Sequence, residues 1–156
     1  MKKQIKYPIL ALGFACLVAT YIVSHYRFMI NATGSLPNFG FLVKLGTYPI
    51  KDGEYAAFYP PHNKYYNDKP FIKIVGGLEG GTVIEQDRIF YVGEKEIGYA
   101  KETSIKGDKL DPGPVGVIPP GQYFMYSPHR DSYDSRYSQI GWIPRSRIIG
   151  VAIPVL

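Results

Sequence analysis

The stretch TVIEQDRIFYVGEKEIGYA, residues 82–100, decides the fold class. It holds three short runs rich in β-branched and aromatic residues, at 82–86, 88–92 and 97–100, and the segment 93–96 has the composition of a hairpin turn. Such runs, separated by turn residues, are typical of neighbouring antiparallel strands. The stretch therefore predicts a β-hairpin.

Similar short runs continue through most of the chain. Its 156 residues include 17 Gly, 13 Pro, 14 Tyr and 8 Phe, a composition with many turns that favours strands over helices. Residues 106–120 are rich in Gly and Pro and are expected to form a loop. The sequence predicts a mainly β domain, a sheet coiled or closed on itself like a barrel. The remaining candidate strands are 41–44, 55–59, 71–75, 122–126 and 148–153.

An uncharged apolar run from Tyr7 to about Ser24 precedes this domain. It is just long enough for a membrane-spanning helix, and Lys2, Lys3 and Lys6 before it should stay on the cytoplasmic side. A cleaved signal peptide is the alternative. We expect a retained inner-membrane anchor at 1–26 and a periplasmic domain at 27–156.

Charge and metal-binding residue types exclude several classes of function. The net charge is +5, but the basic residues are spread along the chain, which argues against nucleic-acid binding. Cys16 is the single cysteine, so an internal disulfide is excluded. His25, His62 and His129 lack metal-ligand spacing. We expect neither a metal site nor a cofactor.

Lys73 stands out in the candidate strand 71–75. Alternate residues of a strand face opposite sides, and both faces of this strand are otherwise apolar. Either the side chain reaches the surface, or its amine is buried and its pKa falls below the usual value of about 10.4. A neutral lysine amine can take the proton of a serine hydroxyl, as in known Ser–Lys pairs.

Two further segments carry hydroxyl and charged side chains. Ser35 lies in a Gly- and Pro-containing segment at 31–37, NATGSLP, which could be an ordinary turn. The segment 132–137, SYDSRY, could be a polar turn with an ion pair, or it could adjoin the lysine and orient it. A buried amine needs acceptors for its hydrogens, and Ser132 could supply one.

Taken in order, these segments resemble the type I signal peptidase family. The resemblance covers nearly the whole chain, and the Ser-x-Asp-Ser-Arg element at 132–136 is its most specific part. Three departures are visible: Pro37 comes one place early, Ile74 replaces an arginine after the lysine, and the segment 126–129 replaces Gly-Asp-Asn. These departures, with the spacing of residues 31–37 and the C-terminal Ile-Pro-Val-Leu, are similar to the TraF-type branch of conjugative transfer systems.

The resemblance implies a fold, a chemistry and a substrate. It implies a signal-peptidase-like β domain that cleaves a pilin precursor or another exported preprotein, bound as an extended peptide, and that in some systems joins the pilin ends into a ring. It also implies roles for six residues: nucleophile Ser35, base Lys73, oxyanion donor Thr33, lysine-orienting Ser132, and the supporting pair Asp134 and Arg136.

Two other readings stay open at this point. One is a general signal peptidase that releases many secreted proteins. The other is a non-catalytic envelope or pilus-assembly protein on the same fold, which would have no need for both Ser35 and Lys73.

Overall fold

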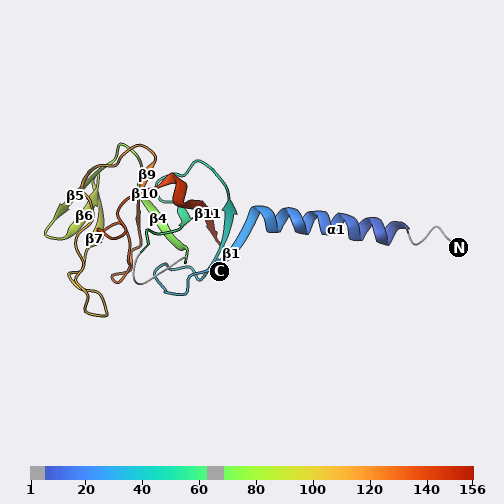
Figure 1. Cartoon of the computed structure of the whole chain (residues 1–156), viewed down its shortest axis with the longest axis horizontal. Helices are drawn as coiled ribbons and strands as arrows, with labels where there is room; N and C mark the ends of the chain where they lie inside the picture. Colours follow the sequence, from blue (N-terminus) through green and yellow to red (C-terminus); the bar gives the residue numbers. More distant parts are fainter. Residues whose placement is uncertain (1–5, 63–68) are drawn as a thin grey trace.

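The β-rich sequence folds into two antiparallel sheets that follow one N-terminal helix (Figure 1). The computed structural model describes residues 6–62 and 69–156. The mainly β fold class predicted from the sequence is confirmed. The elements are α1 Lys6–His25, β1 Tyr26–Ile30, β2 Gly40–Leu45, β3 Tyr55–Phe58, β4 Phe71–Gly77, β5 Thr82–Gln86, β6 Ile89–Val92, β7 Lys95–Tyr99, β8 Gly116–Val117, β9 Gln122–Tyr126, β10 Ile143–Pro144, the short 3₁₀ helix Arg145–Arg147 and β11 Ile148–Pro154.

Helix α1 stands away from the β domain (Figure 1). The stretch Tyr7–His25 has a mean hydropathy of 1.9, and none of it is buried. Twenty helical residues span about 30 Å, the thickness of a bilayer's hydrocarbon core. The helix therefore fits a single-pass membrane anchor. Lys2 and Lys3, on which the predicted orientation partly depends, lie outside the described residues.

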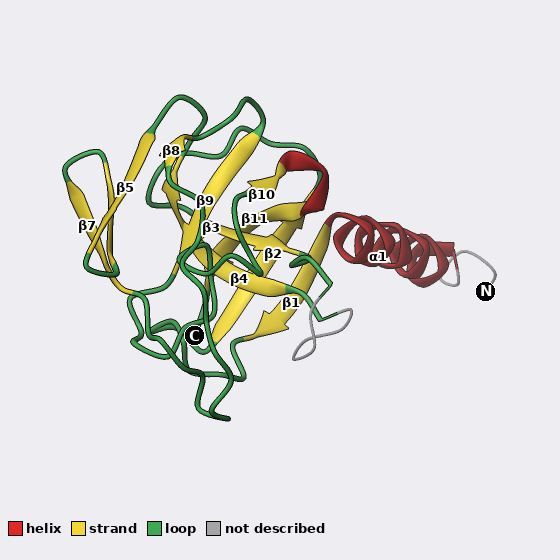
Figure 2. Ribbon diagram, turned by 60° about the vertical axis from the view of Figure 1, so that its left-hand side comes forward, coloured by secondary structure: helices red, strands yellow, loops and turns green. Residues whose placement is uncertain are grey.

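The larger sheet has seven strands in the order β1-β2-β11-β3-β4-β9-β10. Strand β4, which carries Lys73, lies between β3 and β9, and Lys73 is opposite Ala56 of β3. Strand β1 forms one edge and begins at the residue after α1 ends. Among the described residues the ladder ends at β1 and β10, which do not pair with each other. Figure 2 shows the strands of this sheet beside one another, and their buried side chains form two clusters, one with Phe58 and Met125 and one with Phe41 and Val43.

The smaller sheet has the order β7-β6-β5-β8 and contains the predicted hairpin. In this sheet, β5 and β6 are joined by a turn made of Asp87 and Arg88, both with positive φ, as a tight two-residue hairpin turn requires. The candidate strand 88–92 therefore begins one residue early. The turn between β6 and β7 is shorter than the predicted turn at 93–96, because β7 already begins at Lys95. Strand β8 lies inside the segment expected to be a loop.

The two sheets meet at the end of β4. A Cβ on Gly77 would stand 2.7 Å from Ile118 Cδ1 and 2.9 Å from Val92 Cγ1, distances at which a neighbouring side chain would have to move. A glycine there lets the larger sheet approach the core of the smaller one. That core includes Phe90 and Phe124. Packing against it fixes the position of the end of β4 relative to the smaller sheet.

Candidate active site

Lys73 is buried in the middle of strand β4, with 5% of its surface exposed. Lys73 pairs with Ala56 of β3, and the next residue, Ile74, pairs with Tyr126 of β9, so its backbone is held within the sheet. Burial penalises the charged ammonium and lowers the pKa of Lys73 to about 8. The charge of Asp134 opposes this shift, and that of Arg136 adds to it. A minor fraction of the amine, roughly one in ten, is therefore neutral at pH 7.

The Lys73 amine lies between two serine hydroxyls. Lys73 Nζ donates to Ser35 Oγ at 3.1 Å and to Ser132 Oγ at 2.8 Å. Ser35 is 38 residues before the lysine and Ser132 is 59 residues after it. The fold thus brings together three residues that the sequence analysis had singled out separately.

Ser35, the nucleophile predicted from the sequence, lies in the loop between β1 and β2, residues 31–39, which we call the nucleophile loop after that prediction. Thr33 Oγ1 donates to Ser35 Oγ at 3.2 Å, and the Ser35 hydroxyl donates to Asn31 Oδ1 at 3.4 Å. The amide nitrogen of the same side chain, Asn31 Nδ2, donates to the carbonyls of Leu36 at 3.0 Å and Asn38 at 3.1 Å. Asn31 thus joins the Ser35 hydroxyl to the backbone of its own loop.

Ser132 belongs to the segment 127–137, which we call the support segment. Residues 128–131 of this segment are exposed, and its other residues are buried or partly buried. Asp134 and Arg136, 0% and 2% exposed, form an ion pair in which Nη2 donates to Oδ2 at 2.8 Å and Nε donates to Oδ1 at 2.9 Å. Asp134 Oδ2 also accepts from the Ser127 N–H, and Arg136 donates to the Ser127 carbonyl. The pair therefore closes the segment on itself.

Asn31 and Ser127 are the two site residues that the sequence analysis did not assign a role. The Ser127 hydroxyl donates to the carbonyl oxygen of Ser35, which links the support segment to the nucleophile loop. The sequence carried a weak signal for each residue. Asn31 belongs to the quoted segment 31–37, and Ser127 occupies the place of the family's Gly-Asp-Asn.

Ser35 and Lys73 line a cleft of about 480 Å³. Its walls include the end of β1, the start of β4 and the support segment. Among residues 6–62 and 69–156, no group of three or more His, Cys, Asp or Glu side chains is arranged to hold a metal ion. The hydroxyl and amine of the cleft suit acyl transfer from a peptide carbonyl.

Known proteins match this chain over most of its length. The family described as signal peptidase, peptidase S26, matches residues 1–156. A conjugal transfer protein TraF of Agrobacterium fabrum (strain C58) is 32% identical over 151 residues, covering 86% of this chain and 84% of that protein. A second conjugal transfer protein TraF, of Agrobacterium tumefaciens (strain 15955), is 27% identical over 163 residues, covering 93% and 90%. A signal peptidase I crystal structure from Enterococcus faecalis V583 has 22% identity and a TM-score of 0.47, covering 68% of this chain and 98% of that one.

Proposed function

The chain belongs to the peptidase S26 family of signal peptidases, and from this membership we propose that Ser35 and Lys73 form the catalytic dyad of a membrane-anchored serine endopeptidase. The observation that carries the proposal is the buried Lys73 amine, 3.1 Å from Ser35 Oγ. A pKa of about 8 leaves roughly one amine in ten neutral at pH 7, enough to serve as a base. Residues 1–26 are the anchor and 27–156 the catalytic domain.

In the first step Ser35 Oγ attacks the carbonyl carbon of the peptide, and neutral Lys73 takes the hydroxyl proton. The tetrahedral intermediate collapses, the C–N bond breaks, and Lys73 returns the proton to the leaving amine. The Ser35 backbone N–H and the Thr33 hydroxyl are the proposed oxyanion donors, and loss of one such donor typically costs about 3–4 kcal/mol. Ser132 orients Lys73, and the pair of Asp134 and Arg136 holds Ser132 in place.

The proposed substrate is the pilin precursor of a conjugative pilus, bound in the cleft as an extended strand. The names of the two TraF relatives, both conjugal transfer proteins, support a role in conjugation. The acyl-enzyme has two fates. Water releases a shortened pilin, whereas the substrate's own N-terminal amine, held at high effective concentration, forms a new peptide bond and a cyclic product.

The proposed topology follows from the apolar helix and the basic residues before it. Helix α1 spans the inner membrane with its N-terminus in the cytoplasm, so the cleft lies in the periplasm. There it meets exported precursors as they leave the membrane.

The test is the mass of the mature pilin in cells that carry Ser35→Ala or Lys73→Ala. Each variant should leave the precursor unprocessed while the folded protein stays in the membrane, because one removes the nucleophile and the other the base. Ser146→Ala and Lys109→Ala, at exposed positions, are matched controls and should process normally. A cyclic product would be one water lighter than the linear product of the same length.

Normal pilin processing in either dyad variant would contradict the proposal. Rescue of a conditional housekeeping signal-peptidase mutant would instead support a general signal peptidase. Failure of an acylating inhibitor to label Ser35, in protein that is folded, would support a non-catalytic role on the same fold.

A further inference from the structure

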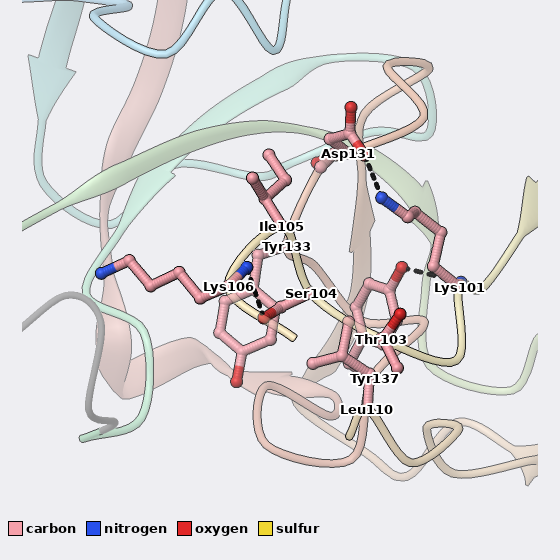
Figure 3. A pocket seen from close by; sticks show the side chains of 10 residues that line it. Lys101, Thr103, Ser104, Ile105, Lys106, Leu110, Asp131, Tyr133 and Tyr137 are labelled. Atoms are coloured by element: carbon pink, nitrogen blue, oxygen red, sulfur yellow. Dashed lines mark hydrogen bonds and ion pairs between the residues drawn. The ribbon is translucent and has the colours of Figure 1, made fainter. Parts of the chain in front are cut away.

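A second pocket, of about 230 Å³, lies beside the catalytic cleft. Figure 3 shows the side chains that line it. Leu110 and Tyr137, 5% and 2% exposed, and the ring of Tyr133 give it an apolar lining. Ile105 is on the same lining and is 83% exposed. An apolar side chain left so exposed beside an apolar pocket gains stability when a ligand covers it.

The pocket and the cleft share part of their walls. Ile105, Asp131, Ser132 and Tyr133 line both. Ser132 is also the residue whose hydroxyl accepts a hydrogen bond from Lys73 at 2.8 Å. A peptide that lies in the cleft therefore passes within side-chain reach of the pocket.

Arg88 holds the loop 100–110, which supplies part of the pocket lining. Its guanidinium donates to the carbonyls of Ala100 at 2.6 Å, Lys101 at 2.7 Å and Leu110 at 2.8 Å, which joins the two ends of the loop. The Lys101 N–H donates to the Tyr137 hydroxyl at 3.0 Å, a contact drawn in Figure 3. The pocket is thus formed in the free protein, and a ligand need not order it.

Size and chemistry indicate what the pocket takes. Its volume is below the range of about 300–1,000 Å³ of pockets that bind whole small molecules, but it suits one large side chain. On one side, the Lys101 amine and the Asp131 carboxylate pair at 2.5 Å and satisfy each other. The amine of Lys106, which also lines the pocket, points away from the other lining side chains in Figure 3, so the lining favours an uncharged group. We propose that this pocket is a specificity subsite that receives one bulky apolar or aromatic side chain of the peptide bound at Ser35. The inference rests on the proposed function, because it assumes that the cleft binds a peptide.

The test measures peptide binding to the full chain carrying Ser35→Ala, in detergent micelles, by fluorescence anisotropy. The probes are labelled alanine peptides in which one phenylalanine occupies each position in turn. One position should bind about tenfold more tightly than the all-alanine peptide, the usual selectivity of an apolar pocket. Adding Thr103→Trp, an exposed residue on the lining, should fill the pocket and remove that gain without weakening the all-alanine peptide.

Glu102→Trp is the matched control, because Glu102 is the exposed neighbour and is absent from the lining; it should keep the gain. Ile105→Ala is a second variant that leaves the core untouched, and it should reduce the gain. Binding of the all-alanine peptide with no preferred phenylalanine position, or a gain that survives Thr103→Trp, would overturn the subsite and leave the peptidase proposal standing. Failure of every peptide to bind would also overturn the subsite. In that case, labelling of Ser35 by an acylating inhibitor in the unmodified chain would test the peptidase proposal separately.

Discussion

Ser35 and Ser132 both accept a hydrogen bond from Lys73, yet their surroundings differ. The Ser132 contact is shorter, 2.8 Å against 3.1 Å, and Ser132 lies in the support segment with its buried ion pair. Ser35 lies in the nucleophile loop, where Thr33 and Asn31 also contact its hydroxyl. Proximity to the amine therefore does not by itself assign the nucleophile.

The difference between the two regions lies in what holds each of them. The support segment is held by a desolvated ion pair, so changes to that pair should act mainly on stability. The nucleophile loop is held by neutral hydrogen bonds from side chains, so changes there should act mainly on reaction rate. Three experiments test this contrast.

The largest expected effect is on the support segment. Asp134→Asn keeps the side-chain shape but leaves the Arg136 guanidinium buried without its counter-charge, which should lower the free energy of unfolding by about 3–5 kcal/mol. Denaturant unfolding in detergent micelles measures it. Asp111→Asn, which breaks the exposed pair with Lys109, is the control and should change stability by less than about 1 kcal/mol. Equal losses in the two variants would refute the contrast.

A smaller effect concerns pH and the shared lysine. Because the pKa of Lys73 is about 8, the neutral fraction rises about tenfold per pH unit below that value. Labelling of Ser35 by an acylating inhibitor should therefore quicken about fiftyfold from pH 6 to 8 and level off above about pH 9. The same shift makes the unfolded chain bind more protons than the folded one between the two pKa values, so stability should increase from about pH 8 to 10.5. A labelling rate independent of pH would exclude Lys73 as the base.

The smallest expected effect is on the nucleophile loop. Asn31→Ala removes the amide that joins the Ser35 hydroxyl to the carbonyls of Leu36 and Asn38. We expect kcat to fall about tenfold, the value of one or two neutral hydrogen bonds, with KM and the pH midpoint unchanged. Asn38→Ala is the control, because the Asn38 side chain contacts Tyr55 instead of Ser35. A loss of stability as large as that of Asp134→Asn would contradict the contrast.

Sequence patterns predicted the strands that have strong β composition. Strands β5 and β9 have the predicted bounds, and β2, β3, β4 and β11 differ from them by two residues or fewer at either end. Strand β1 was missed because it begins directly after the apolar helix, with no turn residues between them. Strands β8 and β10 were missed because each has two residues and lies among Gly or Pro, so tertiary pairing rather than composition forms them.

Local chemistry could be predicted for Lys73, because an isolated charge in an apolar strand is visible in the sequence. The contacts of Asn31 and Ser127 could not be, since their partners include backbone carbonyls. The Ser127 hydroxyl reaches the carbonyl of a residue 92 positions away. Such a contact depends on how two loops meet, which no spacing rule describes.

The direct junction of α1 and β1 has a consequence for which peptide bonds can be reached. Helix α1 ends at His25, β1 begins at Tyr26, and the nucleophile loop follows Ile30. Five strand residues span at most about 17 Å, so they carry the start of this loop no farther than that from the end of the helix. With α1 in the bilayer, as proposed, this short spacer keeps the start of the nucleophile loop near the lipid surface, so the proposed cleavage would be limited to peptide bonds that come close to that surface.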